Sequence, residues 1–250
     1  MRAVFITGGT TGIGMELAKL YVSRGWKVGV CGRDPKKFEE NFLAHRDNVS
    51  FYAVDVGDRA ELKAAIQDFS KSIGLDLLIA NAGIGYQSKS KIPNFEYTYK
   101  MVQINLLGVM YSVEAALDVM IPRGKGHLVV VSSIAGYNGL PGVSGYSATK
   151  AAVQKFAESL HIDLKQYNID VTTICPGFVE TPLTARNNHP MPFIVKAPKA
   201  AALIARAIEK KKMTYAFPFF FSTLVRILSI LPRTWYRFII TKKTLNYSKE

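Results

Sequence analysis

The chain has 250 residues, of which 48% are hydrophobic and 20% are charged. These proportions exclude an intrinsically disordered chain and predict a globular protein that can bury a sizeable core. The net charge of +13 is unevenly spread, because residues 187–250 carry twelve Lys and Arg residues against two Glu residues. Such a basic end favours an anionic partner.

Short apolar runs alternate with amphipathic runs along the first three quarters of the chain. The apolar runs predict strands over residues 3–7, 27–31, 48–54, 75–83, 127–133 and 169–177. Helices are predicted over residues 13–23, from 35 onward, and over 59–72, 97–120 and 146–166. Strands that are apolar throughout, separated by helices, indicate an α/β fold with a parallel sheet covered on both faces. Right-handed crossovers make that sheet doubly wound.

The two cysteines, Cys31 and Cys175, fall in apolar strands and are predicted to be buried free thiols. No zinc spacing is present, and the lone loop residue His189 has no acidic or Cys partner nearby in the sequence, so no metal site is expected. Free thiols predict a reducing, cytoplasmic location. Met1 runs directly into a strand-like stretch, so no signal peptide is expected.

The stretch TGGTTGIG at residues 7–14 joins the first strand to the first helix. Its Gly8, Gly12 and Gly14 allow a tight turn and a close approach of the backbone to a ligand. The helix that follows offers free N–H groups and a positive dipole end to a pyrophosphate. The spacing differs from the usual dinucleotide-binding fingerprint, and a Gly-rich turn without a ligand is the alternative. The position between strand and helix favours the phosphate site.

The end of the second strand indicates which dinucleotide to expect. A ribose 2′-hydroxyl needs a carboxylate there, whereas a 2′-phosphate needs a cation. The chain has Gly32, which leaves room, followed by Arg33, whose guanidinium suits a phosphate. NADP is therefore the preferred cofactor. NAD is the alternative, with Asp34 accepting from the ribose, unless Asp34 only caps the next helix.

A second group of residues is suited to acid–base chemistry. Tyr146 and Lys150 are four residues apart near the start of a helix, so they share a face. A neighbouring ammonium favours the phenolate, so we expect the pKa of Tyr146 to fall toward the range useful for proton transfer. Ser133 and Asn81 end the fifth and fourth strands, at the edge where parallel sheets place ligands. Asn105 lies in an apolar helix, and its alternative role is a core amide that satisfies the backbone.

Seven motifs occur in order along the chain, namely TGGTTGIG, Asp55, ANAG, Asn105, the pair Ser132-Ser133, YSATK and PGFVETP. The set resembles that of the short-chain dehydrogenases/reductases and covers residues 1 to about 183. The resemblance implies a Rossmann-type sheet of about seven strands, the last at Tyr215–Pro218. It implies an NAD(P)-dependent oxidoreductase, here an NADPH reductase, acting on a ketone or secondary alcohol. It also implies a homodimer or homotetramer formed through the helices near residues 97–120 and 146–166.

The resemblance assigns a role to each site residue. Tyr146 is the general acid in reduction, Lys150 lowers its pKa and binds the nicotinamide ribose, and Ser133 polarises the carbonyl. Asn105 holds a water in the proton relay. Ser133 is preferred to Ser132 because its spacing to Tyr146 is similar to the family's. The expected cofactor contacts are Gly8, Thr10, Thr11, Gly12, Ile13, Gly14, Arg33, Asp55, Val56, Asn81, Ala82, Gly83, Tyr146, Lys150, Pro176, Gly177, Val179 and Thr181.

The substrate is less well defined by the sequence. The expected walls, at residues 84–95, 134–145 and 178–193, are aromatic and carry few charges, which predicts a hydrophobic, lipid-like substrate. Residues 1–213 are expected to form one dinucleotide-binding and catalytic domain, and residues 214–250 a last strand and an apolar, basic tail. The alternative is a non-catalytic cofactor sensor that binds a membrane or another partner. The presence of Ser133, Tyr146 and Lys150 argues against it.

The tail from Phe219 to Ile240 is strongly apolar, with Arg226, Arg233 and Arg237 spaced along it. These arginines argue against a membrane-spanning helix. The tail either lies on an anionic membrane surface, with its arginines at the headgroups, or packs on its own domain or on a neighbouring subunit. Nucleic acid is not an expected partner, because bulky aliphatic residues lie among the charges. The expected location is cytoplasmic, or peripheral on the cytoplasmic face of a membrane.

Overall fold

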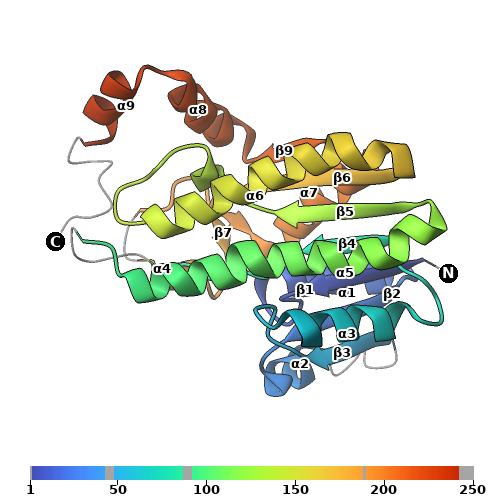
Figure 1. Ribbon diagram of the computed structural model, residues 1–250. Helices are drawn as coiled ribbons and strands as arrows, with labels where there is room; N and C mark the ends of the chain where they lie inside the picture. Colours follow the sequence, from blue (N-terminus) through green and yellow to red (C-terminus); the bar gives the residue numbers. More distant parts are fainter. Residues whose placement is uncertain (1, 43–47, 87–91, 188–189, 242–250) are drawn as a thin grey trace.

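A seven-stranded parallel sheet forms the centre of the protein (Figure 1). The computed structural model describes residues 2–42, 48–86, 92–187 and 190–241. The chain reverses its direction of winding between β1 and β4, because the strands lie in the order β3-β2-β1-β4-β5-β6-β9. This order confirms the predicted Rossmann-type, doubly wound fold. The strands are β1 (Ala3–Thr7), β2 (Lys27–Gly32), β3 (Val49–Ala53), β4 (Leu77–Ala80), β5 (Gly126–Val131), β6 (Ile169–Pro176) and β9 (Thr214–Phe217).

Helices cover both faces of the sheet, because the strands are apolar on both sides. Successive side chains of β1 point to opposite faces, with Val4 and Ile6 on one side and Ala3 and Phe5 on the other, all fully buried. The first face carries α1 (Gly12–Ser23), α2 (Pro35–Phe42) and α7 (Ala197–Glu209). The second face carries α3 (Arg59–Ser70), α5 (Gly108–Arg123) and α6 (Ser144–Asp163). Of these helices, α7 is not predicted from the sequence.

The helix predicted over residues 97–120 consists of three consecutive segments. α4 (Phe95–Met101) begins after Asn94, whose side chain accepts from the Tyr97 N–H at 3.1 Å. A π-helical turn (Val102–Leu107) follows, and α5 continues to Arg123. Among the described residues, the run Phe95–Arg123 is the one helix whose length and composition would allow it to cross a membrane. One side of this run packs on the sheet, so core burial accounts for part of its apolar character.

Two loops at the carboxyl edge differ from the prediction. β4 ends at Ala80 rather than at Gly83, because the N–H groups of Asn81 and Ala82 donate to the Thr7 hydroxyl at 3.0 and 3.1 Å. After β6 the chain forms a small parallel pair, β7 (Val179–Glu180) with β8 (Val195–Lys196), before it enters α7. Short 3-10 turns occupy Ile134–Gly136, Leu164–Tyr167 and Thr184–Arg186.

The apolar tail folds into two helices, α8 (Phe219–Ile230) and α9 (Arg233–Ile240), which we call the C-terminal helix pair. One face of the pair packs on its own domain, against the segment that follows β5. The Asn138 side chain donates to the Val225 carbonyl at 3.1 Å and accepts from Arg233 at 3.4 Å. The Tyr236 hydroxyl donates to the Gly139 carbonyl. The tail was predicted to lie on a membrane surface or to pack on its own domain or on a neighbouring subunit. This one face of the helix pair packs on its own domain.

Both cysteines are buried and unpaired, as predicted. Burial raises the pKa of Cys31 to about 12 and that of Cys175 to about 11, so both are protonated thiols at neutral pH. Among the residues that the structure describes, no three His, Cys, Asp or Glu side chains gather in a way that could hold a metal ion. His189 lies outside those residues.

Candidate active site

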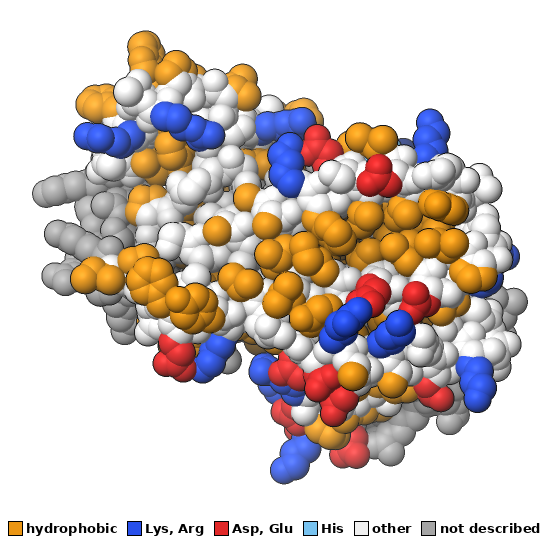
Figure 2. Space-filling view, in the orientation of Figure 1, with side chains coloured by type: hydrophobic (Ala, Val, Ile, Leu, Met, Phe, Trp, Pro, Cys, Tyr) orange, Lys and Arg blue, Asp and Glu red, His pale blue; other side chains and the backbone are white. Residues whose placement is uncertain are grey.

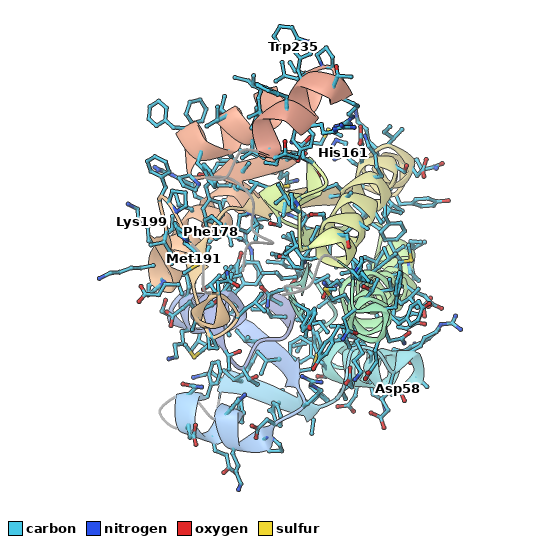
Figure 3. The ribbon with its side chains drawn as sticks, turned by 90° about the vertical axis from the view of Figure 1, so that its left-hand side faces the viewer. Asp58, His161, Phe178, Met191, Lys199 and Trp235 are labelled. Carbon is cyan, nitrogen blue, oxygen red and sulfur yellow. The ribbon has the colours of Figure 1, made fainter. Side chains whose placement is uncertain are left out.

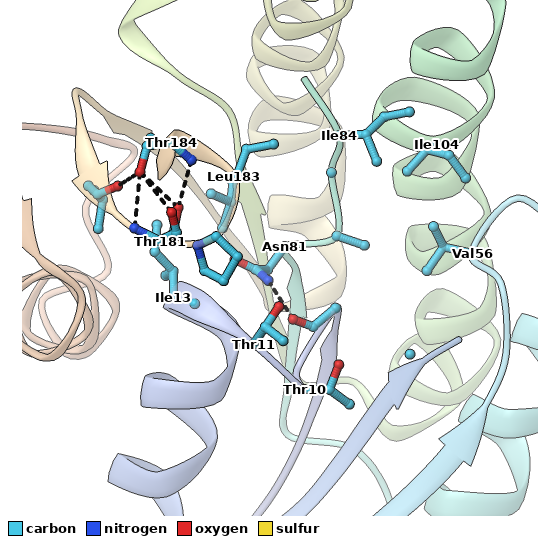
Figure 4. Close-up of a pocket in the computed structure, with 18 of the residues that line it drawn as sticks. Thr10, Thr11, Ile13, Val56, Asn81, Ile84, Ile104, Thr181, Leu183 and Thr184 are labelled. Carbon is cyan, nitrogen blue, oxygen red and sulfur yellow. Dashed lines mark hydrogen bonds between the residues drawn. The ribbon is translucent and has the colours of Figure 1, made fainter. Parts of the chain in front are cut away.

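A cavity of about 310 Å³ opens at the carboxyl edge of the sheet, where the chain segments after β1 and β4 turn to opposite faces of the sheet (Figure 4). Parallel sheets place ligands at this switch point. Two of the predicted site residues, Gly14 and Asn105, do not line the cavity. The others all line it, namely Gly8, Thr10, Thr11, Gly12, Ile13, Arg33, Asp55, Val56, Asn81, Ala82, Gly83, Ser133, Tyr146, Lys150, Pro176, Gly177, Val179 and Thr181.

Backbone contacts require the glycines of the turn at residues 7–14. Gly8 has φ +63°, and a Cβ there would lie 2.8 Å from the Ala82 Cα. A Cβ on Gly14 would lie 2.4 Å from the Gly8 carbonyl oxygen. Gly14 is therefore behind the turn and supports it, whereas Gly8 and Gly12 face the cavity. The Asn81 amide adds support by donating to the carbonyls of Thr7 and Gly8 at 3.0 and 3.2 Å.

The N-terminus of α1 fits an anionic group. Thr11 stands at the N-cap but makes no side-chain capping bond, so the N–H groups of the first turn keep their donors for a ligand. Gly12 and Ile13, in that first turn, line the cavity. The glycines of the preceding turn have no Cβ that would block a ligand, so the N-terminus of α1 suits the diphosphate of a dinucleotide. The residues present therefore fit the predicted cofactor.

Two cations lie at the end of the cavity beside β2. Arg33 lies 3.7 Å from Asp55, and both side chains are substantially exposed. Lys37, on α2, also lines the cavity and lies 3.9 Å from Asp34. Sequence reasoning missed Lys37, although its position four residues after Arg33, at the start of a helix, is a signal that could have found it.

The absence of a side chain at Gly32 has a second reason besides the predicted one. A Cβ there would lie 2.8 Å from the Thr10 hydroxyl, so Gly32 accommodates Thr10 of the glycine turn. Gly32 also lines the cavity, and the room that it leaves for a phosphate group stays a prediction.

At the opposite end of the cavity, Lys150 is buried below Tyr146. Its ammonium donates to the Val131 carbonyl at 2.9 Å and lies 5.8 Å from the centre of the Tyr146 ring. Burial lowers the pKa of Lys150 to about 8. Burial also raises the pKa of Tyr146, against a smaller lowering by its hydrogen bond with Ser133. The predicted fall of the Tyr146 pKa is therefore wrong for this structure, because desolvation outweighs the charge of an ammonium that is bound to Val131.

The two serines after β5 have different surroundings. The Ser132 hydroxyl donates to the Lys150 carbonyl at 2.8 Å and accepts from Gln154 at 3.1 Å, so it fastens α6 to the sheet. The Ser133 hydroxyl accepts from the Ala135 N–H at 3.1 Å, donates to the Pro176 carbonyl at 3.4 Å and lies close enough to the Tyr146 phenol to lower its pKa. Ser133 thus has its hydroxyl next to the phenol, whereas Ser132 is held by the helix.

Asn105 lies in the π-helical turn, fully buried. Its oxygen accepts from the Ile84 N–H at 2.8 Å, and its amide donates to the Ile84 carbonyl at 2.9 Å. A weaker bond of 3.3 Å reaches the Thr149 hydroxyl. These contacts match the predicted core amide, which here fixes the loop after β4. The role in a proton relay stays a prediction.

The turn at residues 179–184 closes one side of the cavity. The Thr184 hydroxyl donates to the Val179 carbonyl at 2.6 Å and accepts from the Thr181 N–H at 3.0 Å (Figure 4). The predicted cofactor contacts end at Thr181, but the cavity lining continues through Pro182, Leu183 and Thr184. These three residues and Ile84 fall within the walls predicted for the substrate, at residues 178–193 and 84–95. The apolar lining residues that were not predicted are Val54, Ile104 and Val131.

The sheet, the glycine turn and the cavity define a Rossmann-type enzyme that takes a nicotinamide dinucleotide. Residues 2–192 match the model of the short chain dehydrogenase family. The chain is 35% identical over 240 residues to a protein of Myxococcus xanthus named as an uncharacterized oxidoreductase, covering 92% of this chain and 93% of that protein. The chain belongs to the short-chain dehydrogenase/reductase family and is an oxidoreductase acting on CH–OH and C=O groups.

Solved structures agree with this fold. Levodione reductase superposes with a TM-score of 0.80 at 25% identity, over 89% of this chain and 98% of that one. ElxO, solved with NADP bound, superposes with a TM-score of 0.77 at 25% identity, over 86% of this chain and 96% of that one.

Proposed function

We propose that this protein is an NADPH-dependent reductase of a hydrophobic ketone and that it acts through Ser133, Tyr146, Lys150 and Asn105. One observation carries the proposal. Ser133, Tyr146 and Lys150 line the same cavity, with the Ser133 hydroxyl close enough to the Tyr146 phenol to lower its pKa and the buried Lys150 ammonium 5.8 Å from the centre of the Tyr146 ring. Two hydroxyls side by side can both donate to one carbonyl oxygen, which is the arrangement that ketone reduction needs.

Ser133, Tyr146 and Lys150 each have a defined part in the reaction. A nicotinamide dinucleotide held by the glycine turn would supply the hydride for the carbonyl carbon. Ser133 donates a hydrogen bond to the carbonyl oxygen and draws negative charge onto it. The raised pKa of Tyr146 keeps its phenol protonated at neutral pH, so its O–H bond breaks only as the proton moves to that oxygen and forms the alcohol. The Lys150 ammonium lies close enough to stabilise the resulting phenolate.

The cation pair at the other end of the cavity supports NADPH over NADH. Arg33 and Lys37 can both contact a 2′-phosphate beside β2, where one cation was predicted. Their partners Asp55 and Asp34 are exposed, and such surface ion pairs stabilise the fold little, so a phosphate can replace them. ElxO, which has a similar fold, binds NADP.

Aromatic side chains around the predicted substrate region support a hydrophobic ketone. Tyr86 stacks on Tyr97 with ring centres 4.1 Å apart. Phe178 and Phe193, after β6, both contact the Phe221 ring of α8, at 6.0 and 5.9 Å. Apolar rings in the predicted substrate region favour a substrate with an extended hydrocarbon part.

The test is NADPH oxidation measured with a series of methyl ketones of increasing chain length, with NADH in parallel. Each added methylene that is buried contributes about 0.8 kcal/mol, so kcat/KM is expected to rise about fourfold per carbon until the site is filled. NADPH is expected to be the better reductant at every length. A series with no turnover, or with a preference for short charged ketones, contradicts the proposal.

We also propose that the protein assembles as a homodimer or homotetramer through α5 and α6. Figure 2 shows hydrophobic side chains gathered over these two helices. The patch includes Tyr111 and Leu117 of α5 and Leu160 of α6, which are only partly buried. Sedimentation velocity is expected to give the mass of two or four chains, and a monomer at micromolar concentration contradicts the proposal.

A further inference from the structure

The C-terminal helix pair is apolar on its outer face as well as on its inner face. The inner face packs on the domain through Phe221, Ser222 and Val225 of α8 and through Ile240 of α9. The outer face holds seven of the eighteen large hydrophobic side chains that are exposed in the described part of the chain. They are Phe219, Phe220, Leu224, Ile227, Ile230, Trp235 and Phe238, of which Phe220 is 82% exposed and Ile230 is 79% exposed. A helix on a water-facing surface normally has a polar outer face, so this face needs a partner.

The charges of this region all have one sign. The sequence has no Asp or Glu between Glu209 and Glu250, but it has nine Lys and Arg residues there. Arg226, Arg233 and Arg237 lie on the helix pair itself and are exposed. Figure 2 shows Lys and Arg side chains next to hydrophobic ones over α8 and α9. A partner for this face must therefore offer both an apolar interior and negative charge.

We propose that the outer face of the C-terminal helix pair binds the surface of an anionic lipid bilayer. In this position the aromatic and aliphatic side chains enter the headgroup boundary and the arginines contact lipid phosphates. α8 has twelve residues and is about 18 Å long, too short for a hydrocarbon core of about 30 Å, and Leu231 and Pro232 separate it from α9. The pair therefore lies in the plane of the surface and does not span it.

Other partners fit this face less well. A second copy of the chain, placed face to face, would bring the same arginines together with no acidic residue on either side. A nucleic acid would satisfy the arginines but has no use for an exposed row of Leu, Ile and Phe side chains.

The position of the helix pair links membrane binding to the proposed function. Within this inference, only that link rests on the proposed function. α8 follows β9 after Pro218, and its Phe221 contacts Phe178 and Phe193, which lie in one of the predicted substrate walls. Figure 3 shows Trp235 at the outer end of the pair, pointing away from the domain. A bilayer bound to the outer face would thus lie beside the route by which a lipid-like ketone reaches Tyr146.

The experiment is co-sedimentation of the full-length protein with two kinds of vesicle, phosphatidylcholine alone and phosphatidylcholine mixed with phosphatidylglycerol. The protein is expected to bind the mixed vesicles and to be released by high salt, because charge attraction is screened. The test variant is Ile227→Gln with Ile230→Gln, on the outer face. Its control is Tyr167→Gln with Met213→Gln, which changes two exposed apolar side chains outside α5, α6 and the C-terminal helix pair.

We expect the outer-face variant to bind the mixed vesicles at least about tenfold more weakly, while the control binds like the wild type. An Arg237→Gln variant is expected to weaken binding to the mixed vesicles only. The proposal is overturned if the wild type does not bind the mixed vesicles, if control and test variants lose binding equally, or if the outer-face variant changes only the sedimentation coefficient. Turnover of a short, water-soluble ketone reports on the proposed function separately and is expected to be the same in all these variants.

Discussion

The glycine turn at residues 7–14 and the C-terminal helix pair lie at the same edge of the sheet, but they are held in different ways. In the turn, neighbouring backbone atoms leave no room for a Cβ at Gly8 or Gly14. The helix pair is held by the hydrogen bonds of Asn138 and Gly139 and by one apolar face. A region whose sequence is dictated by backbone contact carries the chemistry common to a family. A region attached by a few side chains is free to carry what is particular to one protein.

The largest effect is expected when a methyl group is added to the glycine turn, which tests whether backbone contacts hold the turn rigid. Gly14→Ala brings a Cβ to 2.4 Å from the Gly8 carbonyl, so the turn must move. Overpacking of this kind costs about 3 kcal/mol, and we expect NADPH affinity to fall about a hundredfold in a fluorescence titration. Gly25→Ala is the control, because Gly25 has φ +74° but no atom within 4 Å of its Cβ position. If Gly14→Ala binds NADPH as Gly25→Ala does, the turn is not rigid.

The second prediction tests the cation pair beside β2. Arg33→Ala removes the proposed charged contact to the 2′-phosphate, worth about 2 kcal/mol, so NADPH affinity is expected to fall about thirtyfold. NADH affinity is expected to stay the same. Lys37→Ala is expected to act in the same direction, whereas Lys36→Ala, next to it but outside the cavity lining, is expected to change neither affinity. Equal losses for NADPH and NADH would contradict a phosphate site.

The third prediction compares how a buried cation and an exposed cation of the tail affect the free energy of unfolding. Burial lowers the Lys150 pKa from 10.5 to about 8, which corresponds to about 3 kcal/mol of instability below pH 8. That cost disappears as the pH rises from 8 to 10.5, because the unfolded chain then loses its proton as well. Allowing about 1 kcal/mol for the lost bond to Val131, Lys150→Met is expected to be about 2 kcal/mol more stable than the wild type at pH 7 in urea unfolding.

The control for this prediction is Arg237→Met, which removes an exposed charge and is expected to change the free energy of unfolding by less than about 0.5 kcal/mol. The gain of Lys150→Met should shrink steadily between pH 8 and 10.5. A gain that is independent of pH, or a loss of stability at pH 7, would show that the Lys150 ammonium is not strained by its burial.

The smallest expected effect concerns the attachment of the helix pair. Asn138→Ala removes the bonds to Val225 and Arg233 and is expected to cost about 1 kcal/mol. Hydrogen exchange of α8 and α9 should become faster while that of β1 and β4 stays unchanged. Faster exchange in the sheet as well would show that the pair is part of the domain core.

Sequence reasoning worked best where the backbone itself constrains the residue. The sheet and the glycine turn were predicted because apolar strands and Cβ-free positions are visible in the residues. It failed where the outcome depends on what a side chain faces. The Tyr146 pKa was expected to fall because the Coulomb argument did not include burial or the bond between Lys150 and Val131. The tail was equally ambiguous, since the composition does not show that its two faces have different partners.

The most direct test of the central claim is to compare Tyr146→Phe with Tyr167→Phe, which changes an exposed tyrosine outside the cavity lining. Removing a general acid is expected to lower the rate of ketone reduction by about 10²–10⁴-fold, while NADPH affinity stays like that of the wild type. Tyr167→Phe is expected to keep both. Reduction at the wild-type rate by Tyr146→Phe would contradict the assignment of the proton donor.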